Sequence, residues 1–183
     1  MRYKIASIHG RFQPFHLAHF RYLQLALEQA ENIYIGLTKI LTEQKVGLET
    51  APHRQNLDSN PLTYFERTSL IKSIMLAEGI DINRVEIGPF PIENPARLPE
   101  FWPQELVCFT TNVSAWNEEK IQTLREIGYT VEILELGNQQ LFMSGTEIRT
   151  LIKKGDDRWK EFVPPHSGHL IEQSVKSALK SRS

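Results

Sequence analysis

The stretch that decides the fold is residues 9–19, His9-Gly10-Arg11-Phe12-Gln13-Pro14-Phe15-His16-Leu17-Ala18-His19. A short apolar run at 5–8 precedes it and predicts a first β-strand. An amphipathic stretch at 20–30 follows it and predicts a helix. A glycine turn between a strand and a helix start offers unpaired N–H groups and about half a positive charge. The stretch therefore predicts an anion site, of the kind that holds a phosphate.

Three basic side chains lie in this turn, and they strengthen that prediction. Arg11 directly follows the glycine, where it is suited to a two-pronged phosphate contact. His16 and His19 are three residues apart, so they share one face of the first helical turn. Two other interpretations of the histidines remain open: a pair of surface or capping residues, and a zinc site with His9 as third ligand. The surrounding pattern favours a polyphosphate.

Strand and helix patterns alternate along the chain. Strands are predicted at 3–9, 32–38, 84–88, 106–110 and 130–136, and helices at 20–30, 64–78, 115–127, 146–153, 157–162 and 166–180. This order predicts an α/β fold with a doubly wound, Rossmann-like parallel sheet, helices on both faces and a helical C-terminus. Ligands of such sheets bind beyond the carboxyl ends of the strands, near the point where the strand order reverses.

Length and charge limit the class of protein. The 183 residues predict a single domain over 1–183, with a core at about 3–165 and a C-terminal helix and tail at 166–183. The formal net charge of −1 argues against a nucleic-acid partner. We find neither a signal region nor an apolar run of membrane-spanning length, so we expect a cytoplasmic protein without a membrane partner.

Two irregular segments and one cysteine complete this picture. Residues 39–61 form a long polar connection, typical of a functional lid or of local disorder. Residues 89–103 hold five prolines, which predict neither strand core nor helix. Cys108 lies in an apolar run and is predicted to be a buried structural thiol.

A second motif lies far downstream, Met143-Ser144-Gly145-Thr146-Glu147-Ile148-Arg149. Together, the two motifs resemble the signatures of the nucleotidyltransferase superfamily of the cytidylyltransferase type. The longer first motif is most similar to that of archaeal-type nicotinamide-nucleotide adenylyltransferases. Two positions depart from the family pattern, because Ala18 and Thr111 stand where the family has glycine. The resemblance spans roughly residues 4–165.

The resemblance implies that AMP passes from Mg²⁺-ATP to nicotinamide mononucleotide, with pyrophosphate released. His16, His19 and Arg149 would be the catalytic residues, the histidines donating to the triphosphate and the arginine binding its outer phosphates. The implied ATP-binding residues are His9, Gly10, Arg11, Phe12, His16, His19, Thr110, Asn112, Ser144, Thr146 and Arg149. The implied acceptor-binding residues are Gly36, Thr38, Arg67, Asn94 and Trp102.

The chemistry agrees with this residue set. An acceptor phosphate is already mostly ionised at neutral pH, so it needs no general base. Positioning, hydrogen-bond donors and cations are sufficient, and Mg²⁺ is expected to arrive with the triphosphate. The sequence shows neither a nucleophile elbow nor a dedicated carboxylate cage for a metal, so no protein-held metal is predicted.

Several alternatives stay open. The acceptor could be nicotinate mononucleotide, phosphopantetheine or an alcohol phosphate with a cytidine donor, and a non-catalytic nucleotide-binding regulatory protein is a further alternative. Ser144 with Glu147 also fits a purely structural helix cap, Arg67 a helix-face ion pair, and Trp102 core packing. The family resemblance also suggests a homo-oligomer.

Overall fold

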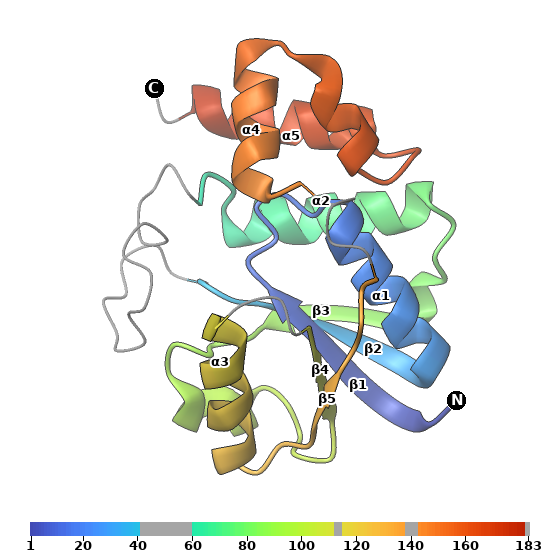
Figure 1. Ribbon diagram of the computed structural model, residues 1–183, viewed down its shortest axis with the longest axis vertical. Helices are drawn as coiled ribbons and strands as arrows, with labels where there is room; N and C mark the ends of the chain where they lie inside the picture. The colour runs from blue at the N-terminus through green and yellow to red at the C-terminus, as the bar shows by residue number, and fades with distance from the viewer. Residues whose placement is uncertain (41–59, 112–114, 138–142, 182–183) are drawn as a thin grey trace. The chain divides into compact units, whose positions relative to one another are not determined.

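A five-stranded, all-parallel sheet forms the centre of the α/β fold (Figure 1). The computed structural model describes residues 1–40, 60–111, 115–137 and 143–181. The strands lie in the order β3-β2-β1-β4-β5. Their bounds are β1 Tyr3–Gly10, β2 Ala30–Leu37, β3 Val85–Pro89, β4 Val107–Thr110 and β5 Val131–Ile133. The predicted fold class and the predicted parallel sheet are confirmed.

The chain divides into two compact units, which we call the sheet unit and the helical unit. The sheet unit consists of Met1–Gly10, Tyr22–Thr50 and Asn83–Gly137. The helical unit consists of Arg11–Arg21, Ala51–Ile82 and Asn138–Ser183. Helix α1 (Leu17–Gln29) begins in the helical unit and ends in the sheet unit. Whether the two units behave as the predicted single domain stays a prediction.

The two faces of the sheet differ in composition because side chains alternate along each strand. On one face β1 contributes Ala6 and Ile8, which the register aligns with Ile33 and Ile35 of β2. The other face carries polar residues toward the carboxyl ends of the central strands. Elsewhere on this face, apolar side chains form a cluster with residues of α3 (Ala115–Glu126) and of the 3₁₀ helix η4 (Pro95–Glu100). One face thus has an apolar centre, whereas the other combines an apolar cluster with a polar end.

The helical unit packs α2 (Tyr64–Ala77), α4 (Gly145–Lys154), α5 (Gly168–Lys180) and the 3₁₀ helix η6 (Asp157–Phe162) around buried Ile, Leu and Trp side chains. The hydroxyls of Thr63 and Ser144 begin α2 and α4 with capping boxes, in which a glutamate three residues on returns the hydrogen bond. The structural cap predicted for Ser144 is confirmed. Gly155 ends α4 in the left-handed conformation.

Two predicted boundaries are wrong by three residues, and one predicted irregular segment contains a helix. Helix α1 begins at Leu17 instead of at residue 20, and β5 ends at Ile133 instead of at residue 136. The proline-rich segment contains the short helix η4, although no helix was predicted there. Pro95 starts that helix, where a missing N–H costs nothing. Among the described residues, no helix is long and apolar enough to cross a membrane. Cys108 is fully buried and free, as predicted.

Candidate functional site

The loop that follows β1 is held in place by side chains from α2 and the segment before it. The amide of Gln13 donates to the Leu62 carbonyl at 2.8 Å and accepts from the Leu62 N–H at 2.9 Å. Arg67, only 1% exposed, donates to the Arg11 carbonyl at 2.8 Å. Phe12, between Arg11 and Gln13 in the chain, has a backbone φ of 51°. This conformation costs a non-glycine residue of order 1 kcal/mol. The surrounding bonds maintain this strained loop.

The start of α4 lies against the same loop. The Arg149 guanidinium donates to the Gln13 carbonyl and, at 3.2 Å, to the Thr146 hydroxyl. Gly145 makes this approach possible, because a Cβ there would stand 2.5 Å from the Gln13 oxygen. Arg149 is 7% exposed, so its charge is held close to the loop and away from bulk water.

The two predicted catalytic histidines lie together at the start of α1. The centroids of their rings are 3.8 Å apart. The Phe12 ring meets the His19 ring in a T-shaped arrangement, with 4.8 Å between the centroids. The His19 Nδ1 accepts from the His16 backbone N–H at 3.3 Å, so the neutral His19 ring carries its proton on Nε2. His16 Nδ1 is buried and has no hydrogen-bond partner among the residues that the structure describes.

Burial sets the charge of this pair. It lowers the pKa of His16 to about 4, and it lowers the pKa of His19 well below its usual value, with smaller contributions from His16 and Arg11. Both rings are therefore neutral at pH 7 without a ligand. A neutral imidazole still donates one hydrogen bond, and an approaching polyphosphate would favour its protonation.

The remaining predicted phosphate residues border the same loop. The Arg11 guanidinium is 3.5 Å from the Asn60 side-chain oxygen, at the limit of a hydrogen bond. Ser144 and Thr146 are exposed at the N-terminal end of α4. The helical unit thus brings together two helix N-termini and the side chains of Arg11, His16, His19, Arg67 and Arg149. Such an arrangement is suited to a polyphosphate.

A second group of predicted residues lies in the sheet unit. The register pairs Ser7 of β1 with Cys108 of β4, and two positions further along come His9 and Thr110. All four side chains are therefore on one face of the sheet. Neither ring nitrogen of His9 nor the Thr110 hydroxyl has a hydrogen-bond partner within the described parts of the chain. Buried polar groups without partners are rare in proteins.

Two glycines make room for aromatic rings beside this group. A Cβ at Gly36 would come within 2.6 Å of the Phe90 ring, and one at Gly88 within 3.0 Å of the Trp102 ring. The Phe90 ring stacks on the His9 imidazole, with 4.3 Å between the centroids and 4° between the planes. Phe90 and Trp102 therefore cover the carboxyl ends of β2 and β3 on this face.

Three of the four predicted acceptor residues in the sheet unit, Gly36, Thr38 and Trp102, are buried. Trp102 is 5% exposed, belongs to the apolar cluster and donates its Nε1–H to the Pro89 carbonyl at 2.6 Å. Thr38 is buried, and its backbone N–H donates to the Gly10 carbonyl at 3.0 Å. Asn94 is exposed at the start of η4. The packing agrees with the alternative interpretation of Trp102 as a core residue.

The departures from the family pattern cause no backbone strain. Ala18 is the second residue of α1, and neither Ala18 nor Thr111 is among the non-glycine residues with positive φ. Neither position therefore requires the conformational freedom of glycine. The predicted ATP-binding residue Asn112 lies outside the described residues.

Sequence reasoning missed Gln13, Gly145, Phe90 and Lys120. Gln13 and Gly145 lie inside the two quoted motifs, so their positions were a usable signal. Phe90 lies in the proline-rich segment and Lys120 in a helix that looks solvent-facing, and no local pattern marks either one. Lys120 is nevertheless buried, and burial lowers its pKa to about 7.

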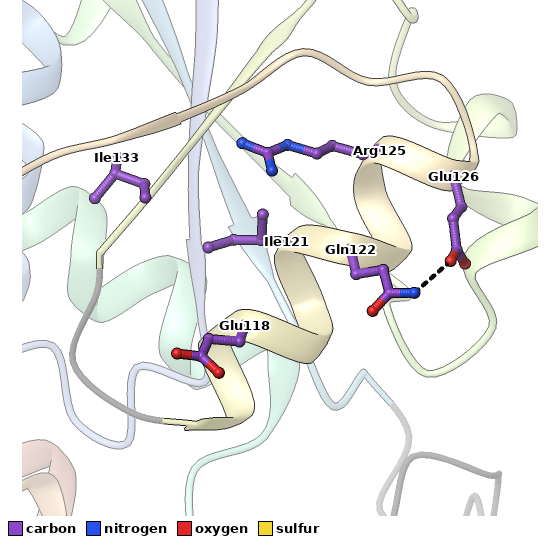
Figure 2. Close-up of a pocket in the computed structure, with 6 residues that line it drawn as sticks. All are labelled: Glu118, Ile121, Gln122, Arg125, Glu126 and Ile133. Carbon is purple, nitrogen blue, oxygen red and sulfur yellow. Dashed lines mark hydrogen bonds between the residues drawn. The ribbon is translucent and has the colours of Figure 1, made fainter.

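One further hollow, in the sheet unit, carries no predicted site residue. Figure 2 shows a hollow between α3 and β5 that is lined by Glu118, Ile121, Gln122, Arg125, Glu126 and Ile133. Gln122 donates to Glu126 across its rim at 2.8 Å. Among the described residues, no group of three or more His, Cys, Asp or Glu side chains is placed to hold a metal ion. The basic loop is thus the strongest candidate site in the helical unit.

A parallel sheet followed by a basic, glycine-led loop at a helix start defines an α/β protein of the phosphate-binding class. The sequence matches the cytidylyltransferase-like family over residues 8–151, and the chain belongs to that family. It is accordingly an enzyme of the nucleotidyltransferase kind, as predicted.

Individual relatives differ in their reactions. The chain is 30% identical over 166 residues to a phosphonoformate cytidylyltransferase from Streptomyces viridochromogenes, covering 91% of this chain and 89% of that protein. It is 32% identical over 167 residues to a nicotinamide-nucleotide adenylyltransferase from Saccharolobus solfataricus, covering 89% and 87%. The family is therefore shared, whereas the substrates of its members are not.

The fold also resembles a solved structure, a bifunctional NMN adenylyltransferase/ADP ribose pyrophosphatase from Francisella tularensis. The TM-score is 0.69 at 18% sequence identity. The match covers 97% of this chain and 50% of that protein, so this chain spans half the length of its structural relative. At this identity the likeness concerns the fold alone.

Proposed function

We propose that the protein transfers a nucleoside monophosphate from a nucleoside triphosphate to a phosphate or phosphonate oxygen of a small acceptor. The acceptor oxygen forms a bond to the α-phosphorus, the bond from that phosphorus to the bridging oxygen breaks, and pyrophosphate leaves. The observation that carries the proposal is the loop of the helical unit, where two helix N-termini and buried cations surround one strained turn.

His19 and His16 would supply hydrogen bonds in this reaction. The backbone bond at Nδ1 leaves the Nε2–H of His19 as the donor, directed by a fixed tautomer. Negative charge builds on the leaving pyrophosphate in the transition state, and donors that are already in position stabilise that charge without reorganisation. The neutral resting state of both rings avoids an uncompensated buried charge before the nucleotide binds.

Arg149 would have two roles. Its bond to the Gln13 carbonyl fixes the loop, and its charge lies at the helix N-terminus where the outer phosphates would bind. A guanidinium is always charged and presents five donors, so one side chain can serve both the backbone and a ligand.

Mg²⁺ belongs to the proposal as a companion of the triphosphate. The donors around the loop are N–H groups, which bind phosphate oxygens but not Mg²⁺. We therefore infer that the ion is held by the nucleotide, and that it neutralises phosphate charge during transfer. The proposal also includes a cytoplasmic location, where nucleoside triphosphates are available.

The first substrate pair is ATP with nicotinamide mononucleotide, which would place the enzyme in NAD biosynthesis. The first motif and the archaeal relatives named as nicotinamide-nucleotide adenylyltransferases support this pair. The second pair is CTP with a small phosphonate. The Streptomyces relative, named as a phosphonoformate cytidylyltransferase, supports it.

The experiment is a pyrophosphate-release assay with Mg²⁺ and each nucleotide in turn, against nicotinamide mononucleotide, nicotinate mononucleotide, phosphopantetheine, glycerol phosphate and phosphonoformate. We expect release that depends on both nucleotide and acceptor. The variant His19→Ala should lower kcat by about a hundredfold or more, whereas the exposed His169→Ala should not. Tight nucleotide binding without release for any acceptor would contradict catalysis and favour a nucleotide-binding regulator.

A further inference from the structure

The side-chain amide of Gln13 pairs with the backbone of Leu62 as one peptide group pairs with another. Its Nε2–H donates to the Leu62 carbonyl at 2.8 Å, and its Oε1 accepts from the Leu62 N–H at 2.9 Å. Opposite residues of antiparallel strands exchange the same two bonds. Gln13 is 5% exposed and Leu62 is 2% exposed, so both bonds are shielded from water. This side chain therefore ties the loop after β1 to the segment before α2.

Three guanidinium groups belong to the segments that meet at Gln13. Arg11 lies two residues before Gln13, and its guanidinium is 3.5 Å from the side-chain oxygen of Asn60 in the segment before α2. Arg67, on α2, donates to the Arg11 carbonyl at 2.8 Å. Arg149, on α4, donates to the backbone carbonyl of Gln13 itself. The position of Gln13 therefore governs the spacing of these three cations.

The spacing of the cations matters more for transfer than for binding. A triphosphate attracts guanidinium groups over several ångströms, so a slightly displaced cation still contributes to affinity. Stabilising the charge that develops during transfer requires donors that are already in place, and a displacement of about 1 Å can cost a hundredfold in rate. A residue that governs the spacing is therefore expected to act on kcat more than on nucleotide affinity.

We propose that Gln13 is a positioning residue for nucleotidyl transfer. Its amide holds the loop against Leu62, so that Arg67 and Arg149 meet the phosphates of the nucleotide at a fixed spacing. All of these residues lie in the helical unit. This inference rests on the proposed function and deepens it, because it assigns a role in transfer to a side chain whose printed bonds are made to the protein backbone.

The test compares Gln13→Met and Gln13→Asn with wild type. Methionine has a similar length and removes both bonds to Leu62. Asparagine keeps the amide on a side chain that is one methylene shorter, so it can pair with Leu62 only if the loop moves. Both substitutions leave the charge of the site unchanged.

Two control variants lie on α5 in the same unit. Gln173→Met repeats the substitution at an exposed position. Ile171→Val removes one methylene from a side chain that is 0% exposed, so it lowers stability without touching the loop. Thermal unfolding, calorimetric binding of Mg²⁺-ATP and Mg²⁺-CTP, and steady-state pyrophosphate release with the acceptor panel are measured for every protein.

We expect Gln13→Met to lower kcat by about tenfold or more and to change nucleotide affinity by less than about threefold. Gln13→Asn should lower kcat in the same direction. Ile171→Val should lower the melting temperature and leave kcat unchanged, and Gln173→Met should change neither. Loss of kcat in the Gln13 variants beyond that in Ile171→Val therefore separates positioning from stability.

An unchanged kcat in Gln13→Met at a lowered melting temperature overturns the inference, because Gln13 would then only stabilise the fold. Weaker nucleotide binding at unchanged kcat overturns it as well. If Gln13→Met shows no cooperative unfolding transition, Gln13→Asn decides by the same criteria. These outcomes leave nucleotidyl transfer intact, whereas absence of turnover in wild type with every substrate pair would refute the proposed function itself.

Discussion

The loop of the helical unit and the polar end of the sheet unit differ in whether their buried polar side chains are hydrogen-bonded. In the loop, Arg67 and Arg149 donate to backbone carbonyls of residues 11 and 13. At the end of the sheet, His9 and Thr110 have no such partners among the described residues. The buried cations of the loop thus fix the backbone around them, whereas the polar groups at the end of the sheet lack partners within the described structure, at a cost in stability.

The largest effect is expected from Arg149→Ala. It removes a charge from the phosphate site and leaves the Gln13 carbonyl without its buried donor. We expect turnover to fall by more than about a hundredfold and the free energy of unfolding by about 1–3 kcal/mol. Steady-state kinetics and urea unfolding measure the two losses, with the exposed Lys153→Ala as control. Loss of turnover at full stability would show that the arginine does not hold the loop.

The next largest effect is a loss of stability in acid. The unfolded chain binds a proton at each histidine near pH 6.5, whereas the folded chain binds one at His16 only near pH 4. The contribution of His16 is therefore complete above pH 6.5 and is lost as the pH falls toward 4, by roughly 3 kcal/mol. The lowered pKa values of His9 and His19 act in the same direction.

Urea unfolding at pH 7.5 and pH 4.5 measures this loss. His16→Asn should flatten the pH dependence relative to wild type. Equal slopes in the two proteins would contradict a neutral, buried His16.

A smaller effect is expected from Gly145→Ala, which tests how closely α4 approaches the loop. Its Cβ would stand 2.5 Å from a backbone oxygen, so the helix start must shift, at a cost of about 1–3 kcal/mol. Gly168→Ala is the matched control, since Gly168 also begins a helix and its Cβ would have no neighbour closer than 3.9 Å. Thermal unfolding of the pair should separate them; equal melting temperatures would mean that α4 does not press on the loop.

The smallest effect, with the opposite sign, is expected from His9→Phe. The ring that stacks on Phe90 is kept, while two partnerless nitrogens are removed. Stability should rise by about 1 kcal/mol and nucleotide affinity should fall. Arg67→Met in the loop should instead lower stability, because its donors serve carbonyls. A destabilised His9→Phe would remove the contrast between the two regions.

The sequence predicted every strand of the sheet, because buried parallel strands are short apolar runs that local composition reveals. It also predicted the cap at Ser144, since a capping box depends on residues three apart in the chain. It placed the start of α1 three residues too late, because the apolar spacing begins at Phe20 whereas the first helical bond joins Phe20 to His16. Helix ends depend on hydrogen bonds more than on hydrophobic pattern.

By itself, the sequence determined the α/β class, the basic turn and the family, because each depends on residues close together in the chain. Only the tertiary structure decided which of the polar side chains are hydrogen-bonded and which have no partner among the described residues. Gln13 meets Leu62 and Arg149, and His9 meets Phe90, across separations of 49, 136 and 81 residues. No local pattern encodes such contacts, because they form only when distant segments pack, and packing alone sets the burial that leaves His9 and His16 neutral.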